Sequence, residues 1–247
     1  MQFFFPSQSP ALIILLCGIL FIATFSYVSQ FETLPDFSTY KNVKEKKQAF
    51  FDYLTPKVDA VNQSIIEDRS EVESINDSFS GSLHWLTRAR LVAIAHRYGI
   101  KPDQDTTDQT LLAETLLRVN VVPRSLALIQ AAKESGWGTS KFARLANNLF
   151  GQQCFVKGCG IVPTARAAGR KHEVERFVTV QDAVAGYAYN LNSHPRYAEL
   201  RRIRAKLART DQPITGVALA DGLLAYSERG AAYVAEIQSM IRQNKLE

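Results

Sequence analysis

Glu134 is the residue of this sequence best placed for acid–base chemistry. It ends an apolar stretch, and Gly136 and Gly138, which follow it, permit a sharp turn. If residues 123–135 form a helix, burial and the partial negative charge at the helix C-terminus both raise the pKa of the Glu134 carboxyl. A carboxyl that stays protonated near neutral pH can act as a general acid. A glutamate in a last helical turn can equally face water, so position alone leaves both interpretations open.

A pair of cysteines offers a second kind of chemistry. Cys154 and Cys159 flank a predicted turn, and their spacing can close a small disulfide loop. A disulfide indicates an oxidising compartment. The alternative is half of a zinc site completed by His172 and His194, although these two histidines lack the compact spacing of a ligand pair.

A mostly helical domain must position these groups. Apolar spacing predicts helices over residues 84–98, 111–119, 123–135, 140–146, 181–191, 195–208 and 230–245. An extended segment at 148–154 and an alternating strand at 173–179 predict a small β element between the helices. The sequence therefore predicts a mainly α fold of the α+β class.

The N-terminal third differs in character from the rest. The run from Ala11 to Val28 is apolar, uncharged and nearly long enough to span a bilayer, and no clear cleavage site follows it. Residues 1–29 are therefore predicted to be an uncleaved transmembrane helix. Residues 30–80 indicate a helical stalk or linker with a break at Pro56, and the compact domain is expected to span residues 81–247. Lysines just after the apolar run favour a cytoplasmic domain by the positive-inside rule, whereas a disulfide favours an oxidising compartment.

Composition and motifs exclude several function classes. The chain of 247 residues has a formal net charge of +5, and its basic residues are not interleaved with aromatic ones, so nucleic acid is not an expected partner. The basic run over residues 196–209 is predicted to be a solvated helix face. The sequence has no glycine-rich phosphate loop, and His84 and His96 lack metal-ligand spacing. We therefore expect neither a cofactor nor a metal.

One block of the sequence resembles a known family. The segment SLALIQAAKESGWGTSKFA at 125–143 and the pentapeptide NNLFG at 147–151 resemble the glucosaminidase domain of Bax-like proteins. The similarity runs from about residue 81 to the C-terminus and includes the cysteine pair and NSHPRY at 192–197. It implies a lysozyme-like fold with a small β element beside the active site. It also implies a hydrolase that cuts the β-1,4 bond after N-acetylglucosamine in the glycan strands of peptidoglycan. With the N-terminal helix, it implies a periplasmic domain anchored in the inner membrane.

The resemblance also implies roles for individual residues. Glu134, in the motif ESGWG, is expected to protonate the leaving oxygen. For the family's second acidic residue, on a β segment, this sequence offers only Glu173 and Glu175. Tyr197 is a candidate to orient the acetamido group of the substrate, which can replace a second carboxylate as nucleophile; a packed tyrosine is the alternative. The side chains expected to bind sugars are Trp137, Asn148, Phe150 and Tyr189. For Trp137, an ordinary core aromatic is the alternative.

Other functions stay open at this point. A lytic transglycosylase of the same fold uses a lone glutamate, but it cuts after N-acetylmuramic acid without water and leaves a 1,6-anhydro end. A non-catalytic protein would only tether the membrane to the wall. An amidase would need a zinc ion or a Cys–His pair, and the sequence supports neither.

Overall fold

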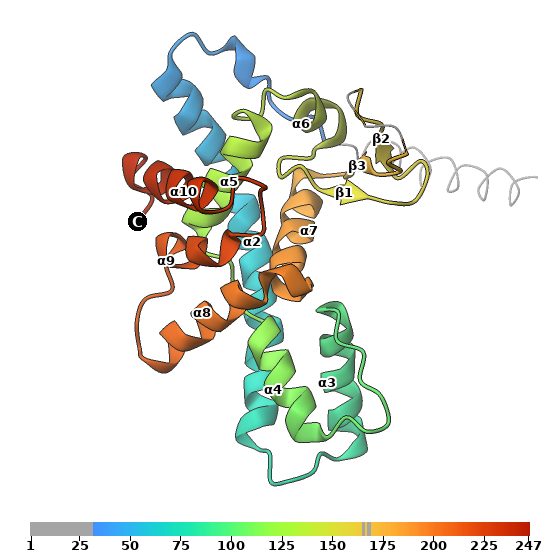
Figure 1. Ribbon diagram of the computed structural model, residues 1–247. Helices are drawn as coiled ribbons and strands as arrows, with labels where there is room; N and C mark the ends of the chain where they lie inside the picture. The colour runs from blue at the N-terminus through green and yellow to red at the C-terminus, as the bar shows by residue number, and fades with distance from the viewer. Residues whose placement is uncertain (1–31, 165, 167–168) are drawn as a thin grey trace, which may run out of the picture.

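The computed structural model describes residues 32–164, 166 and 169–247 (Figure 1). The predicted membrane anchor at 1–29 lies outside these residues. No helix within the described ranges is long and apolar enough to cross a membrane. The first described residue, Glu32, is fixed to the domain, because its N–H donates to the Val178 carbonyl at 3.0 Å and its carboxylate accepts from the Val180 N–H at 2.8 Å.

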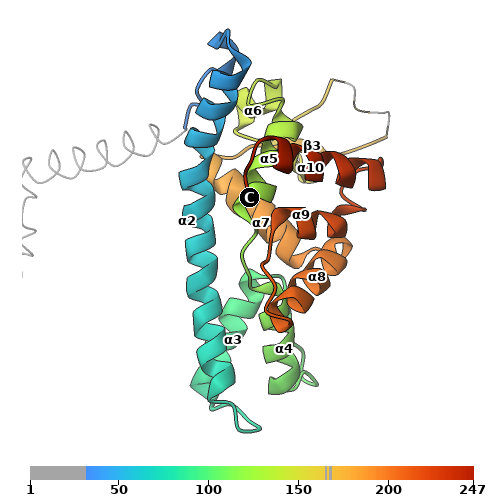
Figure 2. The same cartoon turned by 90° about the vertical axis from the view of Figure 1, so that its left-hand side faces the viewer.

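A single long helix, α2 (Val43–Asp77), runs along the molecule (Figure 2). It packs against α4 (Asp108–Arg118), α5 (Arg124–Ser135) and α7 (Val180–Ser193). The apolar side chains that it buries are Phe50, Phe51, Leu54, Val58, Val61, Ile65, Val72 and Ile75. These side chains belong to the same hydrophobic core as those of α5 and α7.

This packing corrects the prediction that residues 30–80 form a stalk separate from the domain. A solvated stalk would leave the apolar side of α2 in water, whereas the structure buries it in the core. The break predicted at Pro56 does not occur either, since α2 continues through it. A proline inside a helix costs about 3 kcal/mol or more. Burial of Leu54 and Val58 on either side offsets this cost by about 1.5–3 kcal/mol each.

Most of the other helices form where apolar spacing predicts them. α3 (Trp85–Arg97) and α4 pack together against the C-terminal half of α2 (Figures 1 and 2). α5 lies against the N-terminal half and packs on α10 (Ala231–Gln243). α6 (Lys141–Ala146) and α8 (Ala198–Arg209) also lie within or close to their predicted segments.

Four short elements were not predicted as separate elements. A 3-10 turn, η1 (Phe37–Thr39), precedes α2, and a second one, η2 (Pro195–Tyr197), precedes α8. α9 (Gly216–Leu219) continues directly into η3 (Ala220–Leu223), and both pack on α8 and α10. Their brevity explains the omission, because four residues are too few to show a helical period.

A small antiparallel sheet lies beside the helices. Its strands are β1 (Gln153–Cys154), β2 (Gly160–Ile161) and β3 (Glu173–Glu175), in the order β1-β3-β2. The middle residue of β3 pairs with the first residue of β1 and the last residue of β2. The predicted strand at 173–179 is thus shorter in the structure, because the Phe177 N–H leaves the sheet and donates to the carbonyl at the end of α6. The prediction of a mainly helical α+β fold is confirmed.

Candidate active site

Glu134 lies in the last turn of α5, where the chain turns sharply. The helix is buried on nearly all sides because it packs against α2, α9 and α10. Gly136 ends it in the left-handed conformation, with φ 59°, which glycine adopts without steric cost. The Ser135 hydroxyl accepts a hydrogen bond from the Gly138 N–H at 2.7 Å and so fixes the turn. The Glu134 carboxyl is held at this end of the helix, partly buried.

A chain of hydrogen bonds ends on the Glu134 carboxylate. The Tyr187 hydroxyl donates to Gln130 Oε1 at 2.6 Å, and Gln130 Nε2 donates to the Tyr233 hydroxyl oxygen at 3.0 Å. Tyr233 donates its own proton to Glu134 Oε1 at 2.8 Å. Because the Tyr233 oxygen already accepts from Gln130, its proton is directed at Glu134. Among the described residues, Glu134 Oε2 receives no hydrogen bond, so this oxygen is the one available to a substrate.

Burial raises the pKa of Glu134 above its ordinary value, and this effect is the largest of those that act on the carboxyl. The hydrogen bond from Tyr233 and the charge of Lys133 act in the opposite direction. Lys133 Nζ is itself engaged by Glu236 Oε1 at 2.5 Å, and Glu236 also binds Arg229 at 2.6 Å. Glu134 therefore holds its proton to a higher pH than an exposed glutamate does, as a general acid requires.

Tyrosine rings surround this carboxyl. Tyr226 stacks on Tyr233 with ring centroids 5.4 Å apart, and Tyr197 lies 6.0 Å from Tyr226. Burial is the main cause that raises the pKa values of Tyr187, Tyr197 and Tyr226, and the charge of Glu134 adds to it in each case. These rings therefore lie near the carboxylate. Tyr197, a candidate from the sequence, is brought to the same site as Glu134.

Sequence reasoning missed Gln130, Tyr187, Tyr226 and Tyr233. Gln130 lies four residues before Glu134, and this spacing puts both on one face of α5. A glutamine within an apolar helix is a signal that could have been used, because a buried amide needs hydrogen-bond partners. The tyrosines carry no such signal, and Tyr233 lies 99 residues from Glu134 along the chain.

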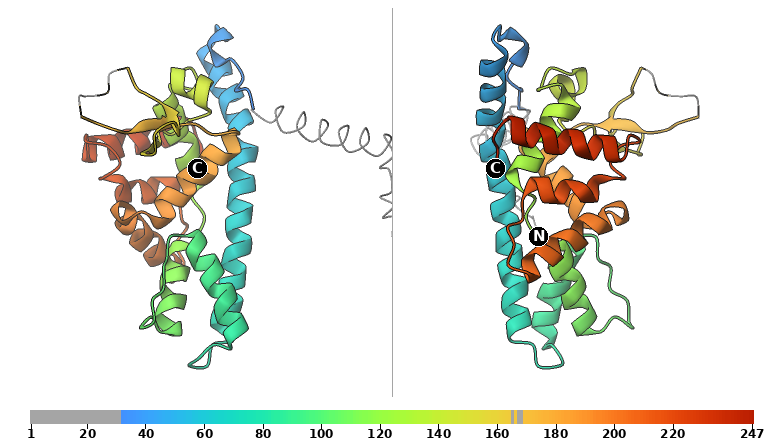
Figure 3. Two further views of the ribbon diagram at one scale, coloured as in Figure 1. Left: turned by 90° about the vertical axis from the view of Figure 1, so that its right-hand side faces the viewer. Right: turned by 60° about the vertical axis from the view of Figure 1, so that its left-hand side comes forward.

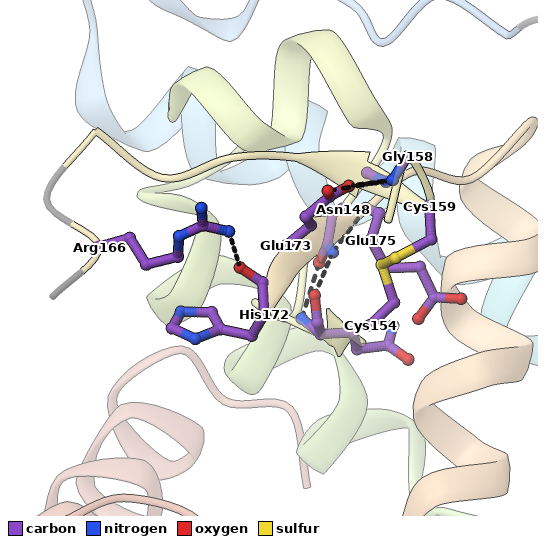
Figure 4. The surroundings of a disulfide bond; sticks show 10 residues. Asn148, Cys154, Gly158, Cys159, Arg166, His172, Glu173 and Glu175 are labelled. Atoms are coloured by element: carbon purple, nitrogen blue, oxygen red, sulfur yellow. Dashed lines mark hydrogen bonds between the residues drawn. A yellow bond between two sulfur atoms is a disulfide. The ribbon is translucent and has the colours of Figure 1, made fainter. Parts of the chain in front are cut away.

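Glu173 is held within the small sheet. Its carboxylate accepts hydrogen bonds from the Gly158 N–H at 3.0 and 3.1 Å and from the Gly160 N–H at 2.9 Å (Figure 4). These hydrogen bonds lower the pKa of Glu173, so the carboxylate stays charged and fixed to the turn. Both carboxylate oxygens thus accept hydrogen bonds within the β element, and the role of Glu173 as a catalytic carboxylate stays a prediction.

Glu175 is the other acidic residue of β3, and its carboxyl is free of such contacts. Among the described residues, no hydrogen bond or ion pair reaches this carboxyl, and burial alone raises its pKa. The backbone of Glu175 is engaged instead: its carbonyl accepts from the Asn148 amide, and its N–H donates to the Gln152 carbonyl at 3.0 Å. Of the predicted pair, Glu175 is therefore the better candidate for a second catalytic carboxylate.

Asn148 and Phe150 support the site from within. Asn148 Nδ2 donates to the carbonyls of Gln152 and Glu175, each at 2.9 Å, and Oδ1 accepts from the Gln152 N–H at 3.0 Å. The Phe150 ring stacks on Tyr187 with centroids 4.1 Å apart. Both side chains are buried. Because their polar atoms and one ring face are occupied within the protein, they can contribute to sugar binding through the residues that they support, and that role stays a prediction.

Trp137 packs on α2. Its ring meets Phe50 and Phe51 edge to face, with centroids 5.8 and 5.3 Å away, and Lys47 Nζ lies 4.9 Å from the ring centroid. These contacts favour the alternative interpretation of Trp137 as a core aromatic over its predicted role in sugar binding.

Tyr189 points away from Glu134. It lines a cavity of about 290 Å³ together with residues of α2 and α3. Two residues along a helix rotate the side chain by about 200°, so Tyr187 faces Gln130 and Tyr189 faces the opposite side of α7. Tyr189 is therefore not brought together with Glu134, and its role in substrate binding stays a prediction.

The cysteine pair is joined by a disulfide between Cys154 and Cys159. Both sulfur atoms are used in this bond and cannot serve as thiolate ligands. No group of three or more His, Cys, Asp or Glu side chains within the described part of the chain could hold a metal ion. The alternative of a zinc site with His172 and His194 is therefore set aside.

Comparison with known proteins shows the family of this chain. The family model described as mannosyl-glycoprotein endo-beta-N-acetylglucosaminidase matches residues 110–246, a range that includes Glu134, Tyr197 and Tyr233. The curated Protein bax of Escherichia coli is 36% identical over 214 residues, which cover 86% of this chain and 75% of that protein. No solved structure matches the chain significantly. The resemblance found in the sequence is confirmed, and the chain belongs to the family of Bax-like proteins that carry a glucosaminidase domain.

Proposed function

We propose that this protein hydrolyses the β-1,4 bond after N-acetylglucosamine in peptidoglycan, with Glu134 as the general acid. The observation that carries the proposal concerns the Glu134 carboxyl. Burial raises its pKa, and Tyr233 donates a hydrogen bond to one of its two oxygens. The family match supports a hydrolase that acts on a glycan, and the matched range includes this glutamate. A lysozyme-like architecture is part of the proposal, supported by the mainly helical fold with its small sheet.

In the proposed reaction, the protonated Glu134 carboxyl donates its proton to the glycosidic oxygen while the bond to the anomeric carbon breaks. Tyr233 holds Oε1, so Oε2 is the oxygen that meets the substrate. Positive charge develops on the sugar, and either the acetamido oxygen of the substrate, oriented by Tyr197, or the Glu175 carboxylate stabilises it. Water then completes the hydrolysis, and Glu134 takes up its proton. No cofactor is needed for these steps.

Product analysis tests this proposal. Purified peptidoglycan is digested with the full-length protein, the products are reduced, and mass spectrometry identifies the new chain ends. Reduced N-acetylglucosamine ends are expected. Ends of 1,6-anhydro-muramic acid would assign the protein to the lytic transglycosylases, and no cleavage would favour a tether between membrane and wall.

Tyr233→Phe is expected to move the basic limb of the pH profile of kcat/KM to higher pH. The tyrosine hydroxyl stabilises the charged carboxylate and so lowers the pKa of Glu134. Without this hydroxyl, less remains to counteract the effect of burial, so the pKa of Glu134 rises further. The acid then stays protonated to higher pH. The carboxyl also loses its orientation, so kcat at the optimum is expected to fall about tenfold, or roughly 1.4 kcal/mol.

The control for this variant is Tyr98→Phe. It also removes a hydroxyl that donates to a carboxylate, Asp68 Oδ2 at 3.0 Å, but in the contact between α3 and α2. Its pH profile is expected to match that of the wild type. A Tyr233→Phe protein whose profile is equally unchanged would contradict the assigned role of Tyr233.

We further propose that residues 1–29 anchor the protein in the inner membrane and that the domain lies in the periplasm. The apolar run from Ala11 to Val28 and the Cys154–Cys159 disulfide, which requires an oxidising compartment, support this topology. The full-length protein is expected in the membrane fraction, and protease added to spheroplasts is expected to digest it. Protection from that protease in intact spheroplasts would place the domain in the cytoplasm and overturn the topology.

A further inference from the structure

The sheet carries an arm that reaches away from the helices (Figures 1 and 3). The described part of this arm consists of residues 153–164, 166 and 169–176. Its first turn is fixed twice, by the disulfide and by the Glu173 carboxylate, which binds two backbone N–H groups of the turn (Figure 4). The turn therefore holds its side chains in defined positions. Phe155 and Val156 are each 75% exposed there.

The arm has an excess of positive charge. Residues 153–176 contain five basic and two acidic side chains, a net charge of +3 out of +5 for the whole chain. The cations exposed on the arm are Lys157, Arg170, Lys171 and Arg176. None of them forms an ion pair with the residues that the structure describes, whereas arginines of α3 and α5 are paired with carboxylates of α2. Of the arm's two carboxyls, Glu173 is bound to the turn and Glu175 is half-buried.

The arm also lies beside the candidate active site. The Phe150 carbonyl, three residues before β1, accepts a hydrogen bond from the Tyr226 hydroxyl at 3.1 Å. In Figures 2 and 3 the arm projects on the same side of the molecule as the N-terminal end of α10, where Tyr233 lies. A polymer bound at Glu134 can therefore extend along the arm.

We propose that the arm binds the acidic stem peptides of peptidoglycan next to the glycan bond held at Glu134, an inference that rests on the proposed function. In intact peptidoglycan the glycan itself is uncharged, because each lactyl carboxyl is in amide linkage to a peptide. The negative charges are therefore the peptide carboxylates. Arginine and lysine bind carboxylates through charge-assisted hydrogen bonds, and salt screens such exposed contacts. Phe155 and Val156 add an apolar surface for the alanine methyl groups of the same peptides.

A binding experiment separates this inference from the proposed reaction. The full-length Glu134→Gln protein, in detergent, is sedimented with insoluble sacculi, so that binding is measured without digestion. The arm variant is the same Glu134→Gln protein with three further substitutions, Lys157→Ala, Arg170→Ala and Lys171→Ala. The arm variant is expected to bind about tenfold more weakly at low salt, and the difference is expected to shrink as salt is raised.

The matched control removes the same charge elsewhere. Lys101→Ala, Lys206→Ala and Arg209→Ala also neutralise three exposed cations that form no ion pair among the described residues. This control is expected to bind within about twofold of the parent, since exposed charges more than a Debye length from the bound polymer, roughly 10 Å at 0.1 M salt, are screened.

A second substrate tests the ligand itself. Sacculi whose carboxylates have been converted to neutral amides keep the glycan and the peptide chains but lose the negative charge. The parent is expected to bind these sacculi as weakly as the arm variant does. The inference would be overturned if the arm variant and the control bound equally well to untreated sacculi. It would also be overturned if the arm variant still bound more weakly than the parent to the amidated sacculi. Neither result depends on which chain ends the active protein produces.

Discussion

Glu134→Gln is expected to lower the rate of peptidoglycan cleavage by about 10²–10⁴-fold, the range for a lost general acid. Glutamine has nearly the same shape as glutamate, and its side-chain oxygen can still accept the hydrogen bond from Tyr233. The variant should therefore fold and bind its substrate. It has no acidic proton to donate to the leaving oxygen, so the loss falls on kcat. Release of soluble fragments and of new reducing ends measures it.

The control for this prediction is Glu236→Gln. It removes a carboxylate close to Glu134 that binds Lys133 and Arg229 at 2.5 and 2.6 Å. Its side chain is 36% exposed, and ion pairs at the surface contribute only about 0–1 kcal/mol. Activity within about twofold of the wild type is therefore expected on the acidic side of the pH profile, where Glu134 is protonated in both proteins, while the basic limb moves to lower pH because the charge of Glu236 raises the pKa of Glu134. If Glu134→Gln retained activity comparable to that of this control, Glu134 would not be the acid.

The sequence was sufficient to propose Glu134 as the acid but not to predict the residues that surround it. Glu134 could be chosen because one short motif determines both the end of its helix and the turn after it. Tyr197 could be proposed for a similar reason. Tyr233 depends on how α10 packs on α5, and such a contact between distant segments has no local pattern. The contacts of Asn148 and Phe150 could not be predicted for the same reason, because their partners lie on other elements.

The basic run at 196–209 shows the same limit for the fold. Its spacing predicted a solvated helix, yet Arg201 and Arg204 are 5% and 1% exposed. Arg204 Nη1 donates to the carbonyls of Asn120 and Val121, each at 3.0 Å, and Nη2 donates to carbonyls at the C-terminal end of α4. A helix end that is buried needs such donors for its unpaired carbonyls. Composition shows that arginines are present, but only the packing of α8 on α4 decides which of them are buried.

A protein that begins at residue 81, the predicted domain boundary, is expected not to fold cooperatively. It would lack α2, whose eight buried apolar side chains fill the core beside α5 and α7. Burial of one such side chain is worth about 1.5–3 kcal/mol. Together the eight contribute about 12–24 kcal/mol, which is comparable to or larger than the roughly 5–15 kcal/mol of stability that a domain has in total. Far-UV circular dichroism and thermal unfolding of residues 81–247 measure the result, for which a low helix content and no sharp transition are expected.

The comparison protein for this deletion begins at residue 32. It keeps α2 and also Glu32, whose carboxylate accepts hydrogen bonds from the Tyr53 hydroxyl at 2.5 Å and from the Val180 N–H at 2.8 Å. This protein is expected to unfold in one cooperative transition. A cooperative transition of residues 81–247 at a similar temperature would show that the domain does not need α2. It would then support the prediction that residues 30–80 form a separate stalk. Otherwise the domain begins at residue 32, only a few residues after the proposed anchor. An anchored domain of that kind has little free chain, so it can cut only the glycan close to the membrane.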